Sequence, residues 1–312
     1  FKFQIISDKT NFNFLKVKSQ AFIISFFLIL ITIFSLFLNG LNFGIDFKGG
    51  ILIELRSKSS NMVNLSEFRS KAYLLNAGEI SVQKFGKDSD VLLRIQKQDG
   101  DNKKQILVIE KAKNLFKDEF EIRRTEFVGP VVGDELKIAG ITAVVLALFL
   151  IMLYIWFRFE WQFSIAAIIA LIHDVITTVG LFSIFKLEFN LAIVAAILTT
   201  AGYSINDTVV VFDRVRENLR KYKSQTHFFI YNKSINETLS RTLITSITTL
   251  IALVIIYFFG GAVLADFALA MIWGVLIGTY SSIFIAVSSL TFFKIYKGEK
   301  KESNEPIPEY ER

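Results

Sequence analysis

The chain has 312 residues, 52% of them hydrophobic, and a mean hydropathy of +0.47, which is typical of membrane proteins rather than of soluble domains. It contains no Cys, which excludes disulfides, thiol catalysis and zinc–thiolate sites. Its net charge of +6 does not indicate nucleic-acid binding, because the basic residues are distributed as membrane topology requires.

Six apolar runs are each long enough to cross a bilayer as a helix. They cover residues 21–38, 138–157, 163–184, 190–212, 243–259 and 264–293. Basic residues gather before the first run, after the fourth and after the sixth, so the positive-inside rule predicts that both termini are cytoplasmic. Residues 1–20 then form a cytoplasmic segment, 213–240 a cytoplasmic loop, and 39–137 a domain on the outer side of the membrane.

The first helix is followed by a glycine-rich stretch, LNFGIDFKGG, at residues 41–50. Its glycines, interleaved with an aspartate and aromatic residues, predict a tight and specific backbone path at the membrane surface. The stretch is not a phosphate-binding loop, because it lacks the Gly-Lys-Ser/Thr ending. We interpret it, with the Gly-Pro pair before the second helix, as a structural motif made of Gly44, Asp46, Gly49, Gly50, Gly129 and Pro130.

The segment between the first two membrane helices alternates between strand and helix periods. Strands are predicted at 51–56, 81–85, 91–96 and 121–127, and helices at 66–77 and 102–116. The order β-α-β-β-α-β predicts a small ferredoxin-like α/β domain inserted into a mainly α membrane protein. This topology supports many functions, and nothing in the segment resembles a catalytic site. We therefore expect a binding or conformational role.

Ionisable residues inside the membrane helices are the main functional candidates, because a carboxylate at membrane depth costs about 2.5–3.5 kcal/mol or more. The fourth helix contains Asn206 and Asp207, and helical spacing places Asp207 on a face of small and polar residues. The third helix contains Asp174 beside His173. Two interpretations stay open for these groups: they carry a proton or ion, or they form hydrogen bonds between helices.

Arg241 is predicted to begin the fifth membrane helix, on the same side of the membrane as the end of the fourth. A direct pair with Asp207, or a shared partner, is geometrically allowed because a guanidinium can reach several ångströms along its apolar stem. The alternative is that Arg241 anchors its helix at lipid headgroups. The sixth helix has Gly274 and Gly278 at a spacing that permits close packing, and the charged tail 294–312 is expected to be disordered.

Five motifs taken together resemble the SecF family, the smaller membrane subunits of the bacterial SecD–SecF protein-export complex. They are LNFGIDFKGG after the first helix, VGPVVGDEL before the second, LIHDVITTVGLFS in the third, AGYSINDTVVVFDRVRENLR in the fourth and SRTLITSITTLIALVIIYFFGG in the fifth. The family is similar to the resistance–nodulation–division transporters, with six helices and a periplasmic domain after the first. The resemblance implies a place in the bacterial inner membrane and SecD, SecYEG, YajC and exported preproteins as partners.

The resemblance also implies that the complex uses the proton gradient to help draw preproteins across the membrane. It implies no enzymatic activity, and no metal or cofactor besides that gradient. Asp207 and Arg241 match the functional acid and arginine of the family, and we add Asn206 and Asp174 as candidate proton-relay residues.

Three other functions are compatible with parts of the sequence. A half-transporter for small molecules would share the six-helix pattern, although residues 39–137 are too few to build an export tunnel. An intramembrane aspartyl protease would use Asp174 and Asp207, but the Gly-x-Gly-Asp element of such enzymes is missing. A purely structural scaffold would differ from the export subunit in lacking any response to a pH gradient.

Overall fold

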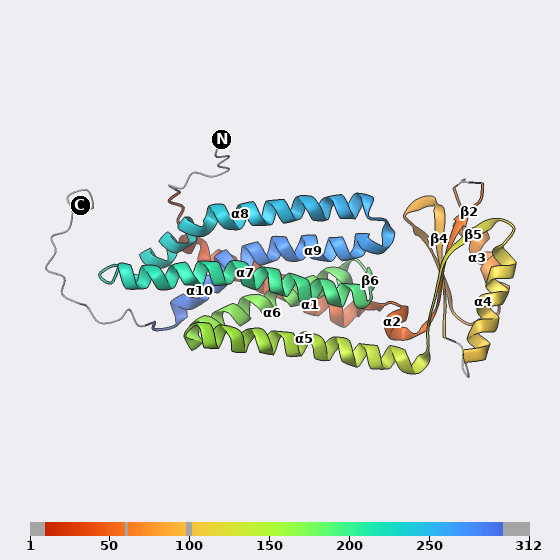
Figure 1. The fold of residues 1–312 in the computed structure, drawn as a ribbon, viewed down its shortest axis with the longest axis horizontal. Helices are drawn as coiled ribbons and strands as arrows, with labels where there is room; N and C mark the ends of the chain where they lie inside the picture. Colours follow the sequence, from red (N-terminus) through yellow and green to blue (C-terminus); the bar gives the residue numbers. More distant parts are fainter. Residues whose placement is uncertain (1–9, 60–61, 98–101, 296–312) are drawn as a thin grey trace.

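The computed structural model describes residues 10–59, 62–97 and 102–295. Long helices run side by side as a bundle, and a small α/β domain stands at one end of it (Figure 1). Six helical segments are long and apolar enough to span a membrane: Phe14–Asn39, Val132–Arg158, Trp161–Ile184, Leu191–Lys221, His227–Phe259 and Leu264–Phe292. The predicted fold class, a mainly α membrane protein with six spans and an inserted α/β domain, is confirmed.

The membrane helices are longer than the apolar runs alone. They are α1 Lys18–Asn39, α5 Pro130–Arg158, α6 Trp161–Ile184, α7 Leu191–Lys221, α8 His227–Phe259 and α9 Ala262–Ser281. A 3-10 turn, Phe14–Val17, leads into α1. The sixth span continues from α9 through a π-helical turn, Ser282–Ala286, the short α10, Val287–Ser289, and a 3-10 turn, Leu290–Phe292.

The second membrane helix begins at Pro130 instead of residue 138, directly after the last strand of the domain. Pro130 occupies the first turn of α5, where its missing N–H costs no hydrogen bond. A side chain at Gly133, in the next turn, would lie 3.1 Å from the carbonyl oxygen of Phe47. The helix therefore starts early because a proline and a small residue let the glycine-rich stretch pack against it.

The segment 213–240, predicted as a loop, is helical at both ends. α7 continues to Lys221, and α8 begins at His227, where the Thr226 side chain accepts a hydrogen bond from the backbone N–H of Phe229 at 3.2 Å. Arg241 consequently lies within α8 and not at its start. The apolar criterion missed these turns because their residues are polar.

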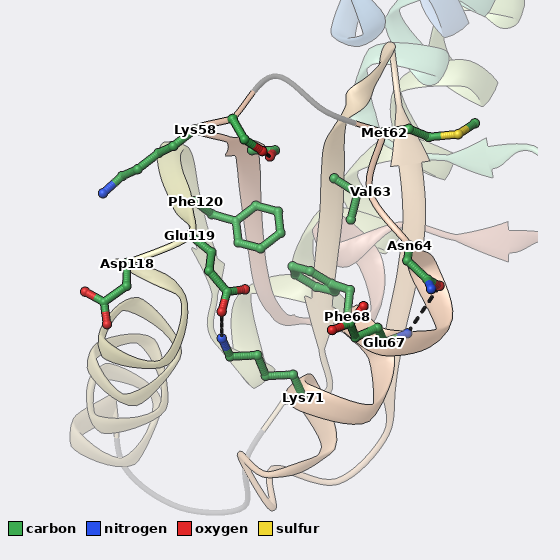
Figure 2. A pocket seen from close by; sticks show the side chains of 12 residues that line it. Lys58, Met62, Val63, Asn64, Glu67, Phe68, Lys71, Asp118, Glu119 and Phe120 are labelled. Carbon is green, nitrogen blue, oxygen red and sulfur yellow. Dashed lines mark hydrogen bonds and ion pairs between the residues drawn. The ribbon is translucent and has the colours of Figure 1, made fainter.

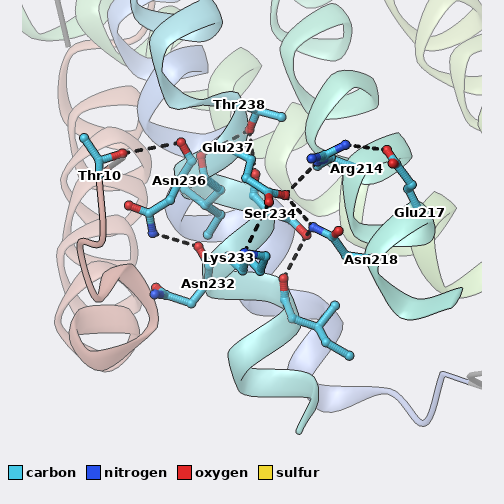
Figure 3. Close-up of polar contacts among 12 residues, drawn as sticks. Thr10, Arg214, Glu217, Asn218, Asn232, Lys233, Ser234, Asn236, Glu237 and Thr238 are labelled. Atoms are coloured by element: carbon cyan, nitrogen blue, oxygen red, sulfur yellow. Dashed lines mark hydrogen bonds and ion pairs between the residues drawn. The ribbon is translucent and has the colours of Figure 1, made fainter. Parts of the chain in front are cut away.

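Polar contacts hold these two helical extensions together (Figure 3). Asn218 donates to the side-chain oxygens of Ser234 and Glu237, at 2.9 and 2.7 Å, and Arg214 donates to Glu237 at 2.7 Å. The amide of Asn236 also binds the chain just before α1, since it accepts from the backbone N–H of Phe12 and donates to its carbonyl, each at 2.8 Å. The hairpin of α7 and α8 is thus tied to the beginning of the first span.

The inserted domain has the predicted β-α-β-β-α-β order. Its elements are β2 Gly50–Ser57, α3 Leu65–Tyr73, β3 Ile80–Phe85, β4 Lys87–Ile95, α4 Asn102–Phe116 and β5 Phe120–Val128. The antiparallel sheet has the order β3-β4-β2-β5, and both helices cover the face that points away from the membrane helices (Figure 1). The ferredoxin-like prediction is confirmed, and the core is closed by Phe68 stacked on Phe116 at 4.4 Å between ring centroids.

A cleft of about 430 Å³ opens on the outer surface of this domain, between the start of α3 and the start of β5 (Figure 2). Phe68 and Phe120 form part of its lining, and Lys71 pairs with Glu119 beside it at 2.7 Å. Asn64 caps α3 at its rim by accepting from the backbone N–H of Ser66 at 3.0 Å. Because its residues belong to the core, a helix cap and a surface ion pair, the cleft is a feature of domain packing.

The glycine-rich stretch joins the domain to the bundle. It forms a two-residue strand, β1 Asn42–Phe43, and a one-turn helix, α2 Ile45–Lys48. β1 pairs in parallel with β6, Glu188–Phe189, the strand that precedes α7. Gly50 has φ +127°, and a side chain there would lie 2.6 Å from the carbonyl oxygen of Ile95, so only glycine fits.

Candidate functional site

Two buried carboxylates lie in the membrane bundle, one on α7 and one on the neighbouring α6. Asp174, on α6, is 2% exposed, and Asp207, on α7 itself, is 3% exposed. No hydrogen bond joins them within the part of the chain that the structure describes. The structure therefore does not bring the two predicted acids together as a catalytic pair, and they must be considered as separate sites.

Asp174 is surrounded by hydrogen-bond donors from three helices. Its Oδ2 atom accepts from the hydroxyl of Ser204 on α7 at 2.6 Å and from that of Ser281, the last residue of α9, at 2.7 Å. Its Oδ1 atom lies 3.0 Å from Nδ1 of His173. Such an arrangement gives the Asp174 side chain the hydrogen-bond partners that a buried carboxyl group needs.

The donors reach Asp174 because α7 and α9 pack very closely. A side chain at Gly278 would lie 2.9 Å from Cβ of Ser204, and one at Gly274 would overlap Thr200, one helical turn away. The predicted small face of the sixth span therefore meets α7, as small-residue faces commonly do in membranes. Directly after Ser281 the helix widens into the π-helical turn, a feature that often occurs at functional sites.

Asp207 has the opposite surroundings. It is as buried as Asp174, yet its Oδ2 atom has no hydrogen-bond partner among the described residues. The hydroxyl of Thr242, on the neighbouring α8, is likewise buried without a partner there. Unpaired buried polar groups are costly, so each unsatisfied group in a native fold calls for a functional or solvent partner.

Arg241 lies next to Thr242 on α8, and its side chain is exposed in the isolated chain. It forms no ion pair with Asp207 within 4 Å in the described residues, so the predicted direct contact is not made in this state. Its charge still acts on the Asp207 carboxylate through space. Asn206 is also exposed and faces away from the buried side of α7. The four predicted relay residues thus divide into two buried acids, Asp174 and Asp207, and two outward-facing polar groups, Asn206 and Arg241.

A chain of hydroxyl groups connects three helices, and it begins at Tyr203, one helical turn before Asp207. Tyr203 on α7 donates to Ser246 on α8 at 3.4 Å, and Ser246 lies 2.7 Å from the hydroxyl of Thr279 on α9. Sequence reasoning did not identify Ser246 or Thr279, nor Ser204 and Ser281 near Asp174. The available signal was the presence of small polar residues inside long apolar helices, which marks helix contacts without saying which helices meet.

The outward-facing side of α7 and α8 is unusual for a membrane surface. On α7 the exposed residues include Ala195, Thr199, Gly202 and Asn206, and on α8 they include Arg241 and Thr248. On α1 and α5 the exposed helix surfaces carry large apolar residues, such as Phe34, Phe37 and Phe157. Small and polar residues at membrane depth typically face another helix.

The predicted structural motif lies at the opposite end of α7 from the polar hairpin. Asp46 accepts a hydrogen bond through Oδ2 from the backbone N–H of Leu191, the first residue of α7, at 2.9 Å. Gly44 has no room for a side chain, because one would lie 2.5 Å from Oε1 of Glu188. Gly49 and Gly50 have positive φ, and Gly129 and Pro130 start α5.

No group of three or more His, Cys, Asp or Glu side chains suited to a metal ion occurs among residues 10–59, 62–97 and 102–295. The expectation that only a proton gradient is needed stays a prediction.

Two family models match the chain. The model of the C-terminal region of the protein-export membrane proteins SecD and SecF matches residues 108–295, and the model of the SecD/SecF GG motif matches residues 34–60. The second match covers β1, α2 and the Gly49-Gly50 pair.

Curated relatives match over nearly the whole length. The protein translocase subunit SecF of Rickettsia bellii is 43% identical over 302 residues, covering 96% of this chain and 99% of the relative. The subunit of the same name from Rickettsia rickettsii is 42% identical over 303 residues, covering 96% and 98%.

Solved structures of SecDF proteins have the same fold. The crystal structure of SecDF from Thermus thermophilus, described as a translocon-associated membrane protein, aligns with a TM-score of 0.82 and 35% identity. A SecDF structure in a super-membrane-facing form aligns with a TM-score of 0.67 and 34% identity. The alignments cover 92% and 91% of this chain but 39% of each solved chain, so most of each SecDF chain has no counterpart here.

Proposed function

Because the chain belongs to the SecD/SecF family of protein-export membrane proteins, we propose that Asp207 couples its role in protein translocation to a proton gradient. The chain is an accessory subunit of the translocation machinery, located in the inner membrane, and SecD is its partner. The small-molecule half-transporter is not favoured, because its relatives are translocase subunits.

The observation that carries the proposal is the missing partner of Asp207. A carboxylate at this depth, buried among helices and without a donor to its Oδ2 atom in the described residues, is not explained by a role in helix packing. Intramembrane acids of this kind mark proton and ion pathways. Asp174, in contrast, has the partners that a structural role requires.

The coupling step is a change in the attraction between Asp207 and Arg241. When Asp207 is ionised, its charge draws the guanidinium toward α7; when it is protonated, that attraction is lost. Since Arg241 is exposed and long, it has room to move between the two positions. Protonation thereby changes how α7 packs against α8, and this is the two-state element that the gradient biases.

The outward-facing side of α7 and α8 is the surface on which SecD docks. A single chain leaves Thr199, Asn206 and Arg241 exposed on membrane-spanning helices, whereas a partner helix would shield them. Docking of SecD on this surface would place Asp207 and Arg241 at the centre of the complex. The translocon SecYEG, YajC and the preproteins are further partners that follow from the family.

The orientation of the chain follows from its charge distribution. The hairpin of α7 and α8 lies in the cytoplasm and the α/β domain in the periplasm, because Arg214, Arg216 and Arg220 surround the hairpin. A Lys223→Cys variant should react with a membrane-impermeant maleimide only from the cytoplasmic side, and reaction from outside would overturn this orientation.

The proposal is tested by gradient-driven release of a preprotein from membrane vesicles that contain the full complex. Asp207→Asn keeps the shape of the side chain but fixes its charge at zero, so release should fall to the level seen without a gradient. Arg241→Met should have the same effect. Asp213→Asn is the matched control, because Asp213 lies on the same helix but forms an exposed pair with Arg158 at 3.1 Å. Release by Asp207→Asn at the rate of the native protein would refute the proposal.

A further inference from the structure

The α/β domain is attached to the membrane bundle in two ways. The chain itself connects it to α1 and α5. In addition, residues 40–46 bind residues 183–191, which form the turn before α7, and we call these two segments together the α7 joint. The sequence suggests only the covalent connections, since the two halves of the joint are far apart in the chain.

Hydrogen bonds run along the whole α7 joint. The backbone N–H of Gly44 donates to the carbonyl of Phe189 at 2.9 Å, and the side chain of Asn42 donates to the carbonyl of Lys186 at 3.2 Å. At its other end the hydroxyl of Ser183 donates to the carbonyl of Gly40 at 2.9 Å. The parallel pairing of β1 with β6 lies between these contacts.

Apolar and charged contacts reinforce the joint. The rings of Phe43, Phe47 and Phe189 lie within 6.1 Å of one another between centroids, and they belong to a buried apolar cluster in the membrane bundle. On the domain side, Arg94 of β4 forms a largely buried ion pair with Glu188 of β6. The sheet of the domain is thus tied directly to the residues that precede α7.

Asp46 connects this joint to α7 itself. Its carboxylate accepts from the N–H of Leu191, at the end of the helix that carries partial positive charge. The other N-terminal donor with a side-chain acceptor, the N–H of Ile193, is capped locally by Asn190 at 3.2 Å. One cap of α7 therefore comes from the helix's own turn, and the other comes from the segment that leads into the domain.

We propose that Asp46 is a positioning residue that makes the α/β domain follow the N-terminal end of α7. The inference rests on the proposed function in one respect: α7 also carries Asp207, so protonation of Asp207 is what would move this helix. A shift of α7 that accompanies protonation then reaches the domain along one rigid helix, through Asp46 and Glu188.

The first measurement reports how firmly the domain is held, and it does not depend on proton coupling. The native chain has no Cys, so spin labels can be placed at Lys113→Cys on α4 and Ser224→Cys in the turn after α7. The full chain, purified with SecD, should give a narrow distance distribution. Asp46→Ala should broaden it, and should lower gradient-driven export about fivefold, as the loss of one capping interaction allows.

Two variants separate this role from simple helix stability. Asn190→Ala removes the local cap of the same helix end, and should leave the distance distribution narrow. Asp46→Asn retains an oxygen acceptor for Leu191, and should behave nearly as the native protein. A native distribution in Asp46→Ala, or equal broadening in Asn190→Ala, would overturn the inference. Neither result bears on the proposed function, which fails only if Asp207→Asn exports normally.

A disulfide gives a second test that does not depend on how well Asp46→Ala folds. Asn42 and Glu188 are register partners in the β1–β6 pair, so Asn42→Cys combined with Glu188→Cys can be oxidised to lock the joint. If the joint moves as one body, oxidation should leave export at the rate of the reduced form of the same variant. Arrest on oxidation and recovery on reduction would show that the joint must open, and would contradict the inference.

Discussion

Asp174 and Asp207 are buried to the same degree on the neighbouring helices α6 and α7, but their hydrogen-bond partners differ. Asp174 receives hydrogen bonds from α7 and α9 and lies beside His173. Asp207 has an unpartnered oxygen in the described part of the bundle, and the exposed Arg241 is on the neighbouring α8. Burial alone therefore does not identify a proton carrier. The number of hydrogen-bond donors around a buried carboxylate distinguishes a structural acid from one that can change its protonation state.

The largest expected effect is on stability, when each acid is removed in turn. Asp174→Ala leaves the hydroxyls of Ser204 and Ser281 without their buried acceptor, and should destabilise the chain by about 3 kcal/mol or more. Asp207→Ala loses no hydrogen bond of this kind to Oδ2, and should cost less than about 1 kcal/mol. Thermal unfolding of the purified complex in one detergent measures both. Equal losses would remove the distinction between the two acids.

A second effect tests the helix contact on which Asp174 depends. Gly278→Ala places a methyl group 2.9 Å from Cβ of Ser204 and should push α9 from α7, at a cost of about 1–3 kcal/mol. Gly202→Ala is the matched control on the outer face of α7, where no atom lies within 4 Å in the single chain. It should leave the stability of the chain unchanged, but weaken its association with SecD in co-purification. A stable Gly278→Ala variant would show that the close contact is not needed.

The sequence predicts one of these two sites better than the other. Asp207, Arg241 and the α/β domain were recognisable because each depends on local pattern: a charge in an apolar run, or an alternation of periods. The partners of Asp174 were not, because Ser204 and Ser281 belong to other helices, and only packing brings them together. The role of Asp46 was missed for a similar reason, since its partner Leu191 lies 145 positions away.

The start of α8 shows a different limit. The apolar run begins at residue 243, but the helix begins at His227, because Thr226 caps it and Asn218 of α7 supports its polar turns. Hydropathy reports where a helix is in the membrane and not where the helix itself ends. The position of Arg241 within α8, which sets where its side chain lies relative to Asp207, therefore required the structure.

The smallest expected effect concerns a third carboxylate, outside the membrane, that resembles Asp174 in having its partners. Arg56 donates two hydrogen bonds to Asp90, at 2.8 and 2.7 Å, and these hold the pKa of Asp90 below its ordinary value of 3.8. The ionised carboxylate therefore stabilises the domain at pH values above 3.8, and this contribution is lost as the pH falls through the lower pKa of the folded state.

This pH dependence is measured by hydrogen exchange of the β2 and β4 amides between pH 5 and about pH 2, a range set by the ordinary pKa of a carboxyl group. The native domain should lose protection on acidification more steeply than Arg56→Met, in which the pKa of Asp90 returns toward its ordinary value. An identical loss of protection with pH in the two proteins would show that Arg56 does not hold Asp90 in its charged form.

Asp207, and not Asp174, is proposed to change its protonation state. Infrared difference spectroscopy of the complex in lipid vesicles tests it directly, because a protonated carboxyl group has a carbonyl band that a carboxylate lacks. We expect a reversible, pH-dependent carboxyl band that is absent in Asp207→Asn and present in Asp174→Asn. A band that persists in Asp207→Asn and disappears in Asp174→Asn would contradict it.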